Sequence, residues 1–397
     1  MNENSLKYTC LFGGGAVRGM TYVGVIKALE ELGVQTKTYA GSSVGAVIAA
    51  LLAVGYGAKE INEIFHEVNF ELFRDIQLGI GPKLALSKGE LFLDWIRGHI
   101  ESKVFGDKYK KGSHRAVTFK DLEKNIVVIT TDLNNYECKE FSKQETPDFE
   151  IAKAIRISCS MPGLIQPLEY NNMILVDGDL QKSWPMWKLS KNLLSDDERI
   201  LELRLEGFAQ SNGLNPLDFA NTVYSCMTAM ASTFISELYG NRDKFDYLVL
   251  NTGNVIVVDF NISKGKRNEL VAVGYKQTMD YFKKALPDKK RKILANYKQI
   301  YKHMIKIKKQ LEHGKIIKAK TSLGEMYTEL CELQKIIDLR DYRNINKFKD
   351  IFLTNIHYPP LLGKIKLKNE ALVLAHLNLT TTGLSDKINE LTDYISN

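Results

Sequence analysis

The order of apolar runs, glycines and helical patterns in the first sixty residues limits the fold more than any other feature of the chain. Residues 8–12 form an apolar run that stops at Gly13-Gly14-Gly15, as expected where a buried strand ends in a loop. Residues 20–32 place apolar side chains at helical spacing, and Gly33 follows as a helix terminator. This part of the chain therefore predicts a strand, a glycine loop and a helix.

The next part repeats the alternation around a serine. A short strand is predicted at residues 36–40 and a small-residue helix at residues 46–54, with Gly41-Ser42-Ser43-Val44-Gly45 between them. The pattern G-x-S-x-G between a strand and a helix is typical of a sharp turn that exposes a nucleophilic serine. Such a turn leaves little space two residues to either side, and Gly41 and Gly45 meet that demand. Ser43 is the candidate nucleophile, and the alternative is that it only caps the following helix.

The glycine triplet suits an oxyanion better than a nucleotide. No Gly-Lys-Ser/Thr follows Gly13 to Gly15, and the full G-x-G-x-x-G spacing of a dinucleotide site is missing. Acyl transfer needs backbone N–H groups aimed at the oxygen that becomes negative, and glycines allow that close approach. We therefore expect these amides to form an oxyanion hole. The helix that begins near Arg18 adds positive potential, and we expect Arg18 to support the loop.

A serine nucleophile needs a base, and the sequence favours a carboxylate over histidine. None of the seven histidines stands late in the amino-terminal domain in a strand-end loop with turn glycines, so a Ser-His-Asp triad lacks sequence support. Asp177 follows the apolar run 173–176 and precedes Gly178, at a strand end where sites form in α/β sheets. Burial can make this carboxylate basic enough to accept the serine proton. The alternative is an ordinary acidic turn at the surface.

Taken together, these motifs resemble the patatin-like phospholipase family, which combines a glycine-rich loop, a G-x-S-x-G serine and a D-G-G/A aspartate. Residues 154–163 and Pro167 are also similar to the family block A-x-x-A-S-x-x-x-P-x-x-x-x-P. The resemblance covers roughly residues 7–285. It implies a three-layer α/β/α sandwich of patatin type and a dyad of Ser43 and Asp177. It also implies an oxyanion hole at Gly13, Gly14, Gly15 and Ala16, of which Ala16 stands where the third glycine of the family would be.

The resemblance implies a lipid acyl hydrolase of phospholipase A type, which cleaves carboxylic esters of membrane phospholipids without a metal or other cofactor. The dyad motif departs from the family at its third position, where Asp179 replaces glycine or alanine. A second carboxylate this close can raise the pKa of Asp177. Two alternatives stay open. One is a serine esterase or thioesterase for soluble acyl compounds, and the other is a weakly active patatin-fold module whose carboxy-terminal helices bind a partner or activator protein.

The composition changes after about residue 285, where lysines become frequent. We expect a patatin-like phospholipase domain at residues 1–285 and a Lys-rich, mainly helical region at residues 286–397. Apolar residues recur at helical spacing from Ile293 to Ile307, and one long helix is predicted to end near Ile337. Its basic face is either solvated or attracted to an anionic membrane surface. No recognised motif accompanies the charge, so nucleic acid is not an expected partner.

The cysteines and the amino terminus favour a cytoplasmic location, with peripheral membrane association through the basic region. The five cysteines include no C-x-x-C pair, which indicates reduced thiols, and the first residues lack the features of a secretory signal. The only long uncharged stretch, residues 38–58, has about the length of a membrane span. Because it contains several glycines, we expect a buried helix there and no transmembrane helix.

Overall fold

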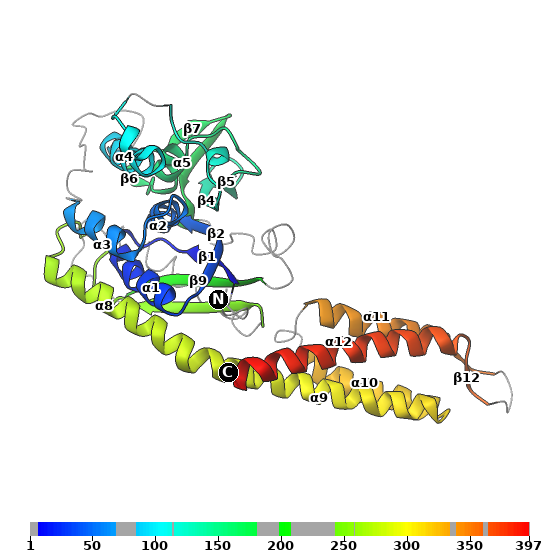
Figure 1. The fold of residues 1–397 in the computed structure, drawn as a ribbon. Coiled ribbons are helices and arrows are strands. Elements are labelled where there is room, and N and C mark those ends of the chain that lie inside the picture. The colour runs from blue at the N-terminus through cyan, green and yellow to red at the C-terminus, as the bar shows by residue number, and fades with distance from the viewer. Residues whose placement is uncertain are drawn as a thin grey trace. The chain divides into compact units, whose positions relative to one another are not determined.

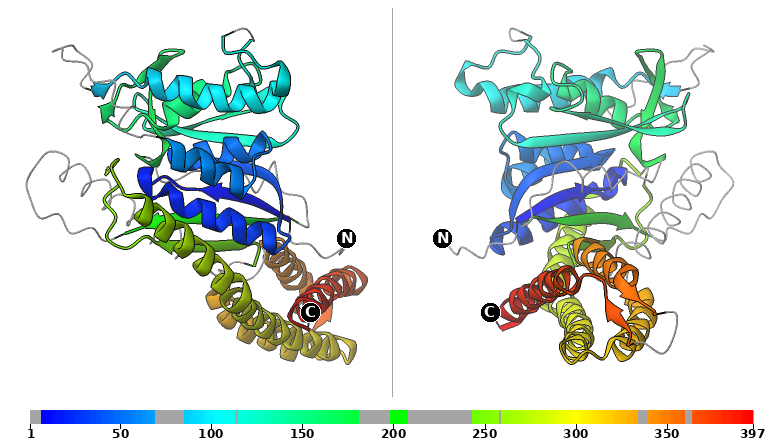
Figure 2. Two further views of the ribbon diagram at one scale, coloured as in Figure 1. Left: turned by 60° about the vertical axis from the view of Figure 1, so that its left-hand side comes forward. Right: turned by 90° about the vertical axis from the view of Figure 1, so that its right-hand side faces the viewer.

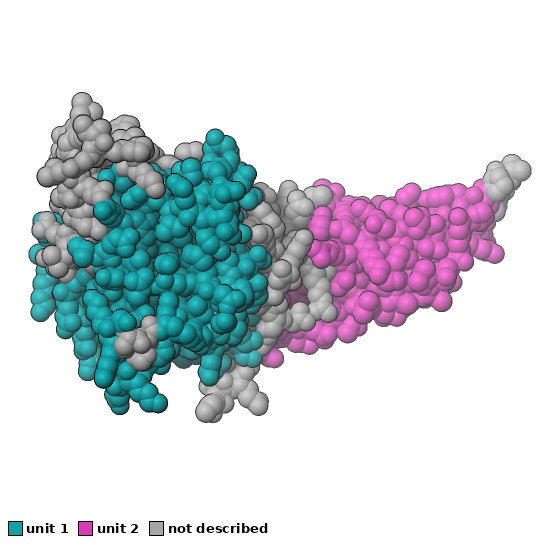
Figure 3. Space-filling model, turned by 90° about the horizontal axis from the view of Figure 1, so that it is seen from above, with its two compact units in different colours: residues 1–237, 245–281 teal, residues 238–244, 282–397 magenta. Residues whose placement is uncertain are grey.

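The structure is a computed structural model, and it describes residues 7–68, 85–112, 115–180, 198–207, 243–257, 259–333, 339–359 and 364–396. The chain forms two compact units, residues 1–237 with 245–281 and residues 238–244 with 282–397 (Figure 3). The predicted division between residues 285 and 286 stays a prediction.

The first unit is built on a mixed eight-stranded sheet (Figure 1). Five neighbouring strands are parallel, namely β10 (Phe245–Asn251), β9 (Glu198–Glu206), β1 (Lys7–Phe12), β2 (Gln35–Ser42) and β4 (Asn125–Asp132). Antiparallel pairing adds β5 (Glu137–Ser142), β8 (Met173–Asp177) and β7 (Leu168–Tyr170) beyond β4. The parallel strands are largely buried, and in β1 only Lys7 is partly exposed.

Helices pack against this sheet and against each other (Figure 2). They are α1 (Met20–Glu31), α2 (Val44–Ala53), α3 (Ala58–Glu67), α4 (Glu90–Phe105), α5 (Ile151–Ser158) and α8 (Lys264–Asp280). Short 3₁₀ turns include η1 (Ala16–Gly19) and η5 (Gly178–Leu180), and β3 (Ala85–Ser87) pairs with β6 (Gly163–Ile165). The predicted alternation of strand, glycine loop, helix, strand, turn and helix is confirmed, as is the α/β class.

The uncharged stretch at residues 38–58 forms the end of β2, the turn at Ser43 and α2. All but the first residue of α2 are buried, and the helix has 10 residues. In the part of the chain that the structure describes, no helix is both long enough and apolar enough to cross a bilayer. The expected buried helix is therefore confirmed.

Helices α1 and α8 approach each other closely because each presents a glycine at the contact. A Cβ atom on Gly24 would lie 1.9 Å from the carbonyl oxygen of Val271, and one on Gly274 would lie 2.0 Å from that of Thr21. These distances are far below any tolerated contact, so only glycine allows this separation of the two helices. The contact fixes α1, which is joined to the glycine loop by the 3₁₀ turn η1.

The second unit consists mainly of helices around its own apolar core. Its long helices are α9 (Leu286–Glu312), α10 (Ile316–Leu333), α11 (Leu339–Asn355) and α12 (Glu370–Ser396), with β11 (Ile356–His357) paired to β12 (Lys366–Leu367). The predicted apolar stripe of α9, including Ile293, Tyr297 and Ile300, is buried in this core. The mainly helical character of the region is confirmed.

The prediction of one long helix to Ile337 is wrong. Helix α9 ends at Glu312, and Gly314 adopts a φ of 67° between α9 and α10. The amide of Gly314 donates to the Leu311 oxygen and the amide of Lys315 to the Gln310 oxygen, which is the usual helix ending at a left-handed glycine. The apolar periodicity continues on both sides of the break, so periodicity alone did not reveal it.

Replacement of Gly24 by alanine is expected to lower the free energy of unfolding of the first unit by about 1–3 kcal/mol or more, because the methyl group must push α1 and α8 apart. The melting temperature, measured by differential scanning calorimetry, should fall by several degrees. Gly98→Ala is the matched control. A Cβ there makes only an ordinary contact of 3.7 Å with the Tyr109 hydroxyl, so alanine should stabilise α4 by up to about 1 kcal/mol. Equal effects of the two substitutions would contradict the close packing of α1 against α8.

Candidate active site

Ser43 lies at a strained turn between β2 and α2. Its φ is 51°, a value that is uncommon for any residue other than glycine. A Cβ on Gly41 would lie 2.3 Å from the carbonyl oxygen of Gly45, and a Cβ on Gly45 would lie 2.0 Å from that of Phe12. The two flanking glycines therefore let the turn fold back on itself and pack against β1. This is the steric role that the sequence predicted for Gly41 and Gly45.

The backbone of Ser43 is held by a serine from α5. The amide of Ser43 donates to the Ser158 hydroxyl at 2.9 Å, and that hydroxyl donates to the Ile129 carbonyl at 2.5 Å. Ser158 is fully buried at the end of α5. The sequence analysis placed Ser158 in the block 154–163 that resembles the patatin-like family but assigned it no role. Its contacts hold the backbone of the turn at Ser43 in place.

Strand β4 brings Ser43 and Asp177 to the same end of the sheet. It lies between β2 and β8, so that Ser42 is in register with Ile129 and Asp177 with Thr130. The turn after β8 is as tight as the turn after β2, because a Cβ on Gly178 would lie 2.2 Å from the Ile129 oxygen. Two strands that are distant in the sequence therefore present their terminal side chains together.

The carboxyl group of Asp177 is buried, with 1% of the residue exposed. Burial raises its pKa to about 8, and the negative charge of Asp179 acts in the same direction. Oδ1 accepts a hydrogen bond from the Asp179 amide at 2.9 Å. Oδ2 accepts no hydrogen bond from the described residues, although the Ser43 side chain is near enough to lower the pKa. Such contacts often tighten only when substrate binds. The site thus contains a basic carboxylate with an oxygen available for a proton.

The unusual Asp179 is held by specific partners. It is 4% exposed, the Ser42 hydroxyl donates to its Oδ1, and Nη1 of Arg204 lies 3.9 Å from the same oxygen. Nε of Arg204 in turn pairs with Glu202 at 2.6 Å. Sequence reasoning missed Ser42, Glu202 and Arg204. The available signal was the alternation of Glu202 and Arg204 with leucines in β9, since buried charges require partners.

The glycine loop offers fewer amides than the sequence predicted. The amide of Gly13 donates to the Leu203 oxygen at 2.9 Å, so it continues the sheet and is not available to an oxyanion. The amides of Gly14, Gly15 and Ala16 donate no hydrogen bond to the described residues. Gly15 and Ala16 have φ values of 152° and 44°. These three amides are the remaining candidates for the oxyanion hole.

Arg18 lies in a buried position after the glycine loop. Its residue exposure is 2%, and its Nε donates to the Val255 oxygen at 2.8 Å while Nη2 lies 3.4 Å from the Gly207 oxygen. The guanidinium therefore ties the loop to the segments after β9 and β10. The supporting role of Arg18 stays a prediction.

Asp177→Asn is expected to stabilise the protein, with an advantage that grows as the pH rises from about 5 to 8. The folded protein retains the Asp177 proton up to about pH 8, whereas the unfolded chain releases it near the ordinary pKa of 3.8, so stability falls as the pH rises through this window. Asparagine removes this dependence. The melting temperature of the Asp177→Asn variant at pH 8 should exceed that of wild type by a few degrees. This corresponds to a gain on the order of 1 kcal/mol in the free energy of unfolding.

The control for this measurement is Asp132→Asn. Asp132 is also fully buried, and it accepts hydrogen bonds from the Asn134 amide and the Asn135 side chain. Asparagine can accept only one of these two hydrogen bonds, so this variant should be less stable than wild type. An Asp177→Asn protein that is less stable than wild type at pH 8 contradicts the assigned protonation of Asp177.

Residues 11–185 match the family model for patatin-like phospholipase, a range that contains the glycine loop, Ser43 and Asp177. The uncharacterized protein YqhO of Bacillus subtilis (strain 168) is 28% identical over 293 residues, which cover 69% of this chain and 97% of that protein. The probable lipid hydrolase 463L of Invertebrate iridescent virus 6 is 30% identical over 187 residues, but these cover only 45% of this chain and 61% of the viral protein.

Among solved structures, VipD from Legionella pneumophila has the same fold. The TM-score is 0.52 at 15% sequence identity, and the match covers 98% of this chain and 88% of VipD. At this identity the likeness concerns the fold and not the activity. The α/β sheet with its helices, the ordered motifs and the family match agree with one another. Residues 11–185 are therefore identified as a patatin-like phospholipase domain.

Proposed function

We propose that this chain is a lipid acyl hydrolase of phospholipase A type, with Ser43 as nucleophile and Asp177 as general base. The observation that carries the proposal is the buried Asp177 carboxyl, whose Oδ2 has no hydrogen-bond partner among the described residues and which shares one end of the sheet with Ser43. Asp177 forms no ion pair with the described residues, whereas Glu202, whose Oε2 also accepts no hydrogen bond, is paired with Arg204. A base needs a free oxygen and a raised pKa, and Asp177 has both.

The proposed reaction proceeds in two steps. Asp177 accepts the hydroxyl proton as Ser43 Oγ attacks the ester carbonyl, and the amides of Gly14, Gly15 and Ala16 stabilise the oxyanion. The carbonyl reforms, the ester C–O bond breaks, and the leaving alcohol takes the proton from Asp177. Water then attacks the acyl-enzyme with Asp177 again as base, which releases the fatty acid and restores Ser43. These steps require no metal ion.

An apolar surface beside the glycine loop supports a substrate with acyl chains. Val257 is fully buried, and the partly buried residues packed around it are Ala16, Met161, Leu164, Ile256 and Phe260. Ala16 belongs to the candidate oxyanion loop, and Met161 directly follows Ser160, whose oxygen accepts the Asp177 amide. Half-exposed apolar side chains next to an ester-cleaving site suit the acyl chain of a lipid.

Ser43→Ala and Asp177→Asn are each expected to reduce phospholipid hydrolysis in mixed micelles by about a thousandfold or more, because each removes one half of the dyad. Ser43→Ala should also abolish labelling by a fluorophosphonate probe. Ser102→Ala is a matched control, since this partly buried serine lies in α4 and bonds to the His99 oxygen. Labelling of Ser43 without release of fatty acid favours the soluble esterase alternative. Wild-type labelling that persists in Ser43→Ala contradicts the proposal.

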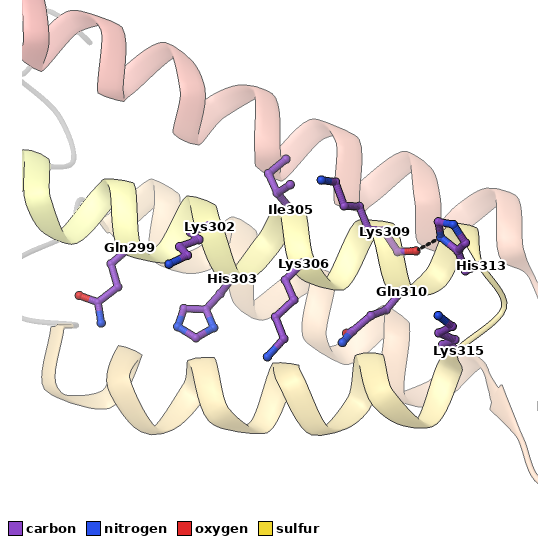
Figure 4. A pocket seen from close by; sticks show the side chains of 9 residues that line it. All are labelled: Gln299, Lys302, His303, Ile305, Lys306, Lys309, Gln310, His313 and Lys315. Atoms are coloured by element: carbon purple, nitrogen blue, oxygen red, sulfur yellow. Dashed lines mark hydrogen bonds between the residues drawn. The ribbon is translucent and has the colours of Figure 1, made fainter.

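A basic hollow in the second unit supports an anionic membrane surface as a partner. It has a volume of about 840 Å³ and is lined by Gln299, Lys302, His303, Ile305, Lys306, Lys309, Gln310, His313 and Lys315 (Figure 4). Glu325 neutralises Lys306, and Glu329 contacts His303. Lys302, Lys309 and Lys315 form no ion pair with the described residues, which leaves the hollow positive. Phosphate-bearing headgroups are attracted to such a surface.

The triple change Lys302→Gln, Lys309→Gln and Lys315→Gln is expected to weaken binding to phosphatidylserine vesicles by on the order of 100-fold, since each lysine near an anionic surface contributes about 1 kcal/mol. Vesicle co-sedimentation at two salt concentrations measures the effect, which should shrink at high salt. The control changes the exposed residues Lys364, Lys366 and Lys368 to glutamine, so that the net charge is equal. Wild-type binding that does not depend on phosphatidylserine contradicts the proposed membrane partner.

A further inference from the structure

Asp179 contacts both halves of the proposed dyad. Its amide donates to Asp177 Oδ1 at 2.9 Å, and its carboxylate accepts a hydrogen bond from the hydroxyl of Ser42, the residue before the nucleophile. It is 4% exposed and lies in the 3₁₀ turn η5 directly after β8. Glycine or alanine at this position could make the amide contact but not the contact with Ser42.

The carboxylate of Asp179 is compensated by charges from a different strand. Arg204 on β9 lies 3.9 Å away and is itself paired with the fully buried Glu202. Arg204 also lies along the glycine loop, because a Cβ on Gly13 would be 2.9 Å from its Cδ. A buried carboxylate without such partners would destabilise the folded protein. The side chains of Ser42, Asp179, Arg204 and Glu202 therefore form one connected polar network.

Given the proposed function, we propose that Asp179 is a positioning residue for Ser43 and Asp177. Its carboxylate anchors the turn that carries Ser43 through Ser42, and its negative charge makes Asp177 a stronger base. The family motif needs only a small residue here, so this arrangement is a property of the present chain. Asp179 itself accepts no proton from substrate and touches none of the reacting atoms.

The surroundings of Asp177 leave Asp179 as the dominant charge that acts on it. Thr131 on β4 bonds to its backbone oxygen and does not titrate. Cys159, at the end of α5, has a pKa raised by burial and by Asp177, so it stays a neutral thiol. Arg156 on α5 donates to Ser160 and to the Gln166 oxygen, and it is not among the groups that shift the pKa of Asp177. After burial, the charge of Asp179 is the largest cause of the raised pKa.

Asp179→Asn and Asp179→Gly separate the two parts of this role. Asparagine keeps an oxygen that can accept from Ser42 but removes the charge. Glycine removes both and restores the residue common in the family motif. The rate of fluorophosphonate labelling of Ser43, measured from about pH 5.5 to pH 9.5, reports the protonation of the base without requiring a lipid substrate. Circular dichroism and melting temperature establish that each variant is folded.

The wild-type rate should rise with pH around a midpoint near pH 8. Asp179→Asn should lower this midpoint by about one pH unit or more with a similar maximal rate. Asp179→Gly should lower both the midpoint and the maximal rate, because the Ser43 turn loses its anchor. Asp132→Asn, a buried carboxylate on β4, should leave the midpoint unchanged.

The result that overturns the inference is a folded Asp179→Asn variant with the wild-type midpoint. A purely structural role of Asp179 predicts this result, because it changes stability without moving the pH profile. If the wild type labels at Ser43, the proposed function survives this outcome and only the role of Asp179 is lost. A folded wild type that labels at no pH overturns both.

Discussion

Ser43 adopts a positive φ because β2 must reverse into α2 while both remain packed against β1, and the rest of the site depends on this turn. Backbone atoms lie so close to Gly41 and Gly45 that neither position has space for a Cβ atom. The turn therefore has almost no conformational freedom. The Ser158 hydroxyl completes it by binding the Ser43 amide. Since β4 lies between β2 and β8, the same packing sets where Asp177 stands relative to Ser43. The packing of the turn and the order of the strands therefore set the relative positions of Ser43 and Asp177, the proposed dyad.

Electrostatics then determine how readily Asp177 can accept a proton in the proposed dyad. A carboxylate near a serine is a useful base only if it is desolvated, but desolvation also destabilises its charged form. The present chain adds a second carboxylate, Asp179, and offsets it with Ser42 and Arg204. In the proposed mechanism the strained turn and the glycine loop hold the reacting atoms, while Ser42 and Arg204 offset the charge of Asp179.

Much of this could be predicted from the sequence, because the signals are local. Periodicity and glycines marked the strands and helices around Gly13 to Gly15 and Ser43, and the D-G pair marked Asp177. The charged network could not be predicted, because Arg204 reaches Asp179 only through the order of strands in the sheet. The hydrogen bond of the Gly13 amide could not be predicted for the same reason, since its acceptor, the Leu203 oxygen, lies on β9. The break at Gly314 was missed for another reason, because an uninterrupted apolar stripe concealed a local backbone change.

The central claim is that Ser43, Asp177 and the glycine loop act on one carbonyl. It is tested most directly by a crystal structure of the protein after reaction with a fluorophosphonate. The account predicts a phosphorus atom on Ser43 Oγ, with its phosphoryl oxygen within about 3 Å of the amides among Gly14, Gly15 and Ala16, and Asp177 Oδ2 facing Oγ. A phosphonate on another residue, or a phosphoryl oxygen that points away from the glycine loop, would contradict it.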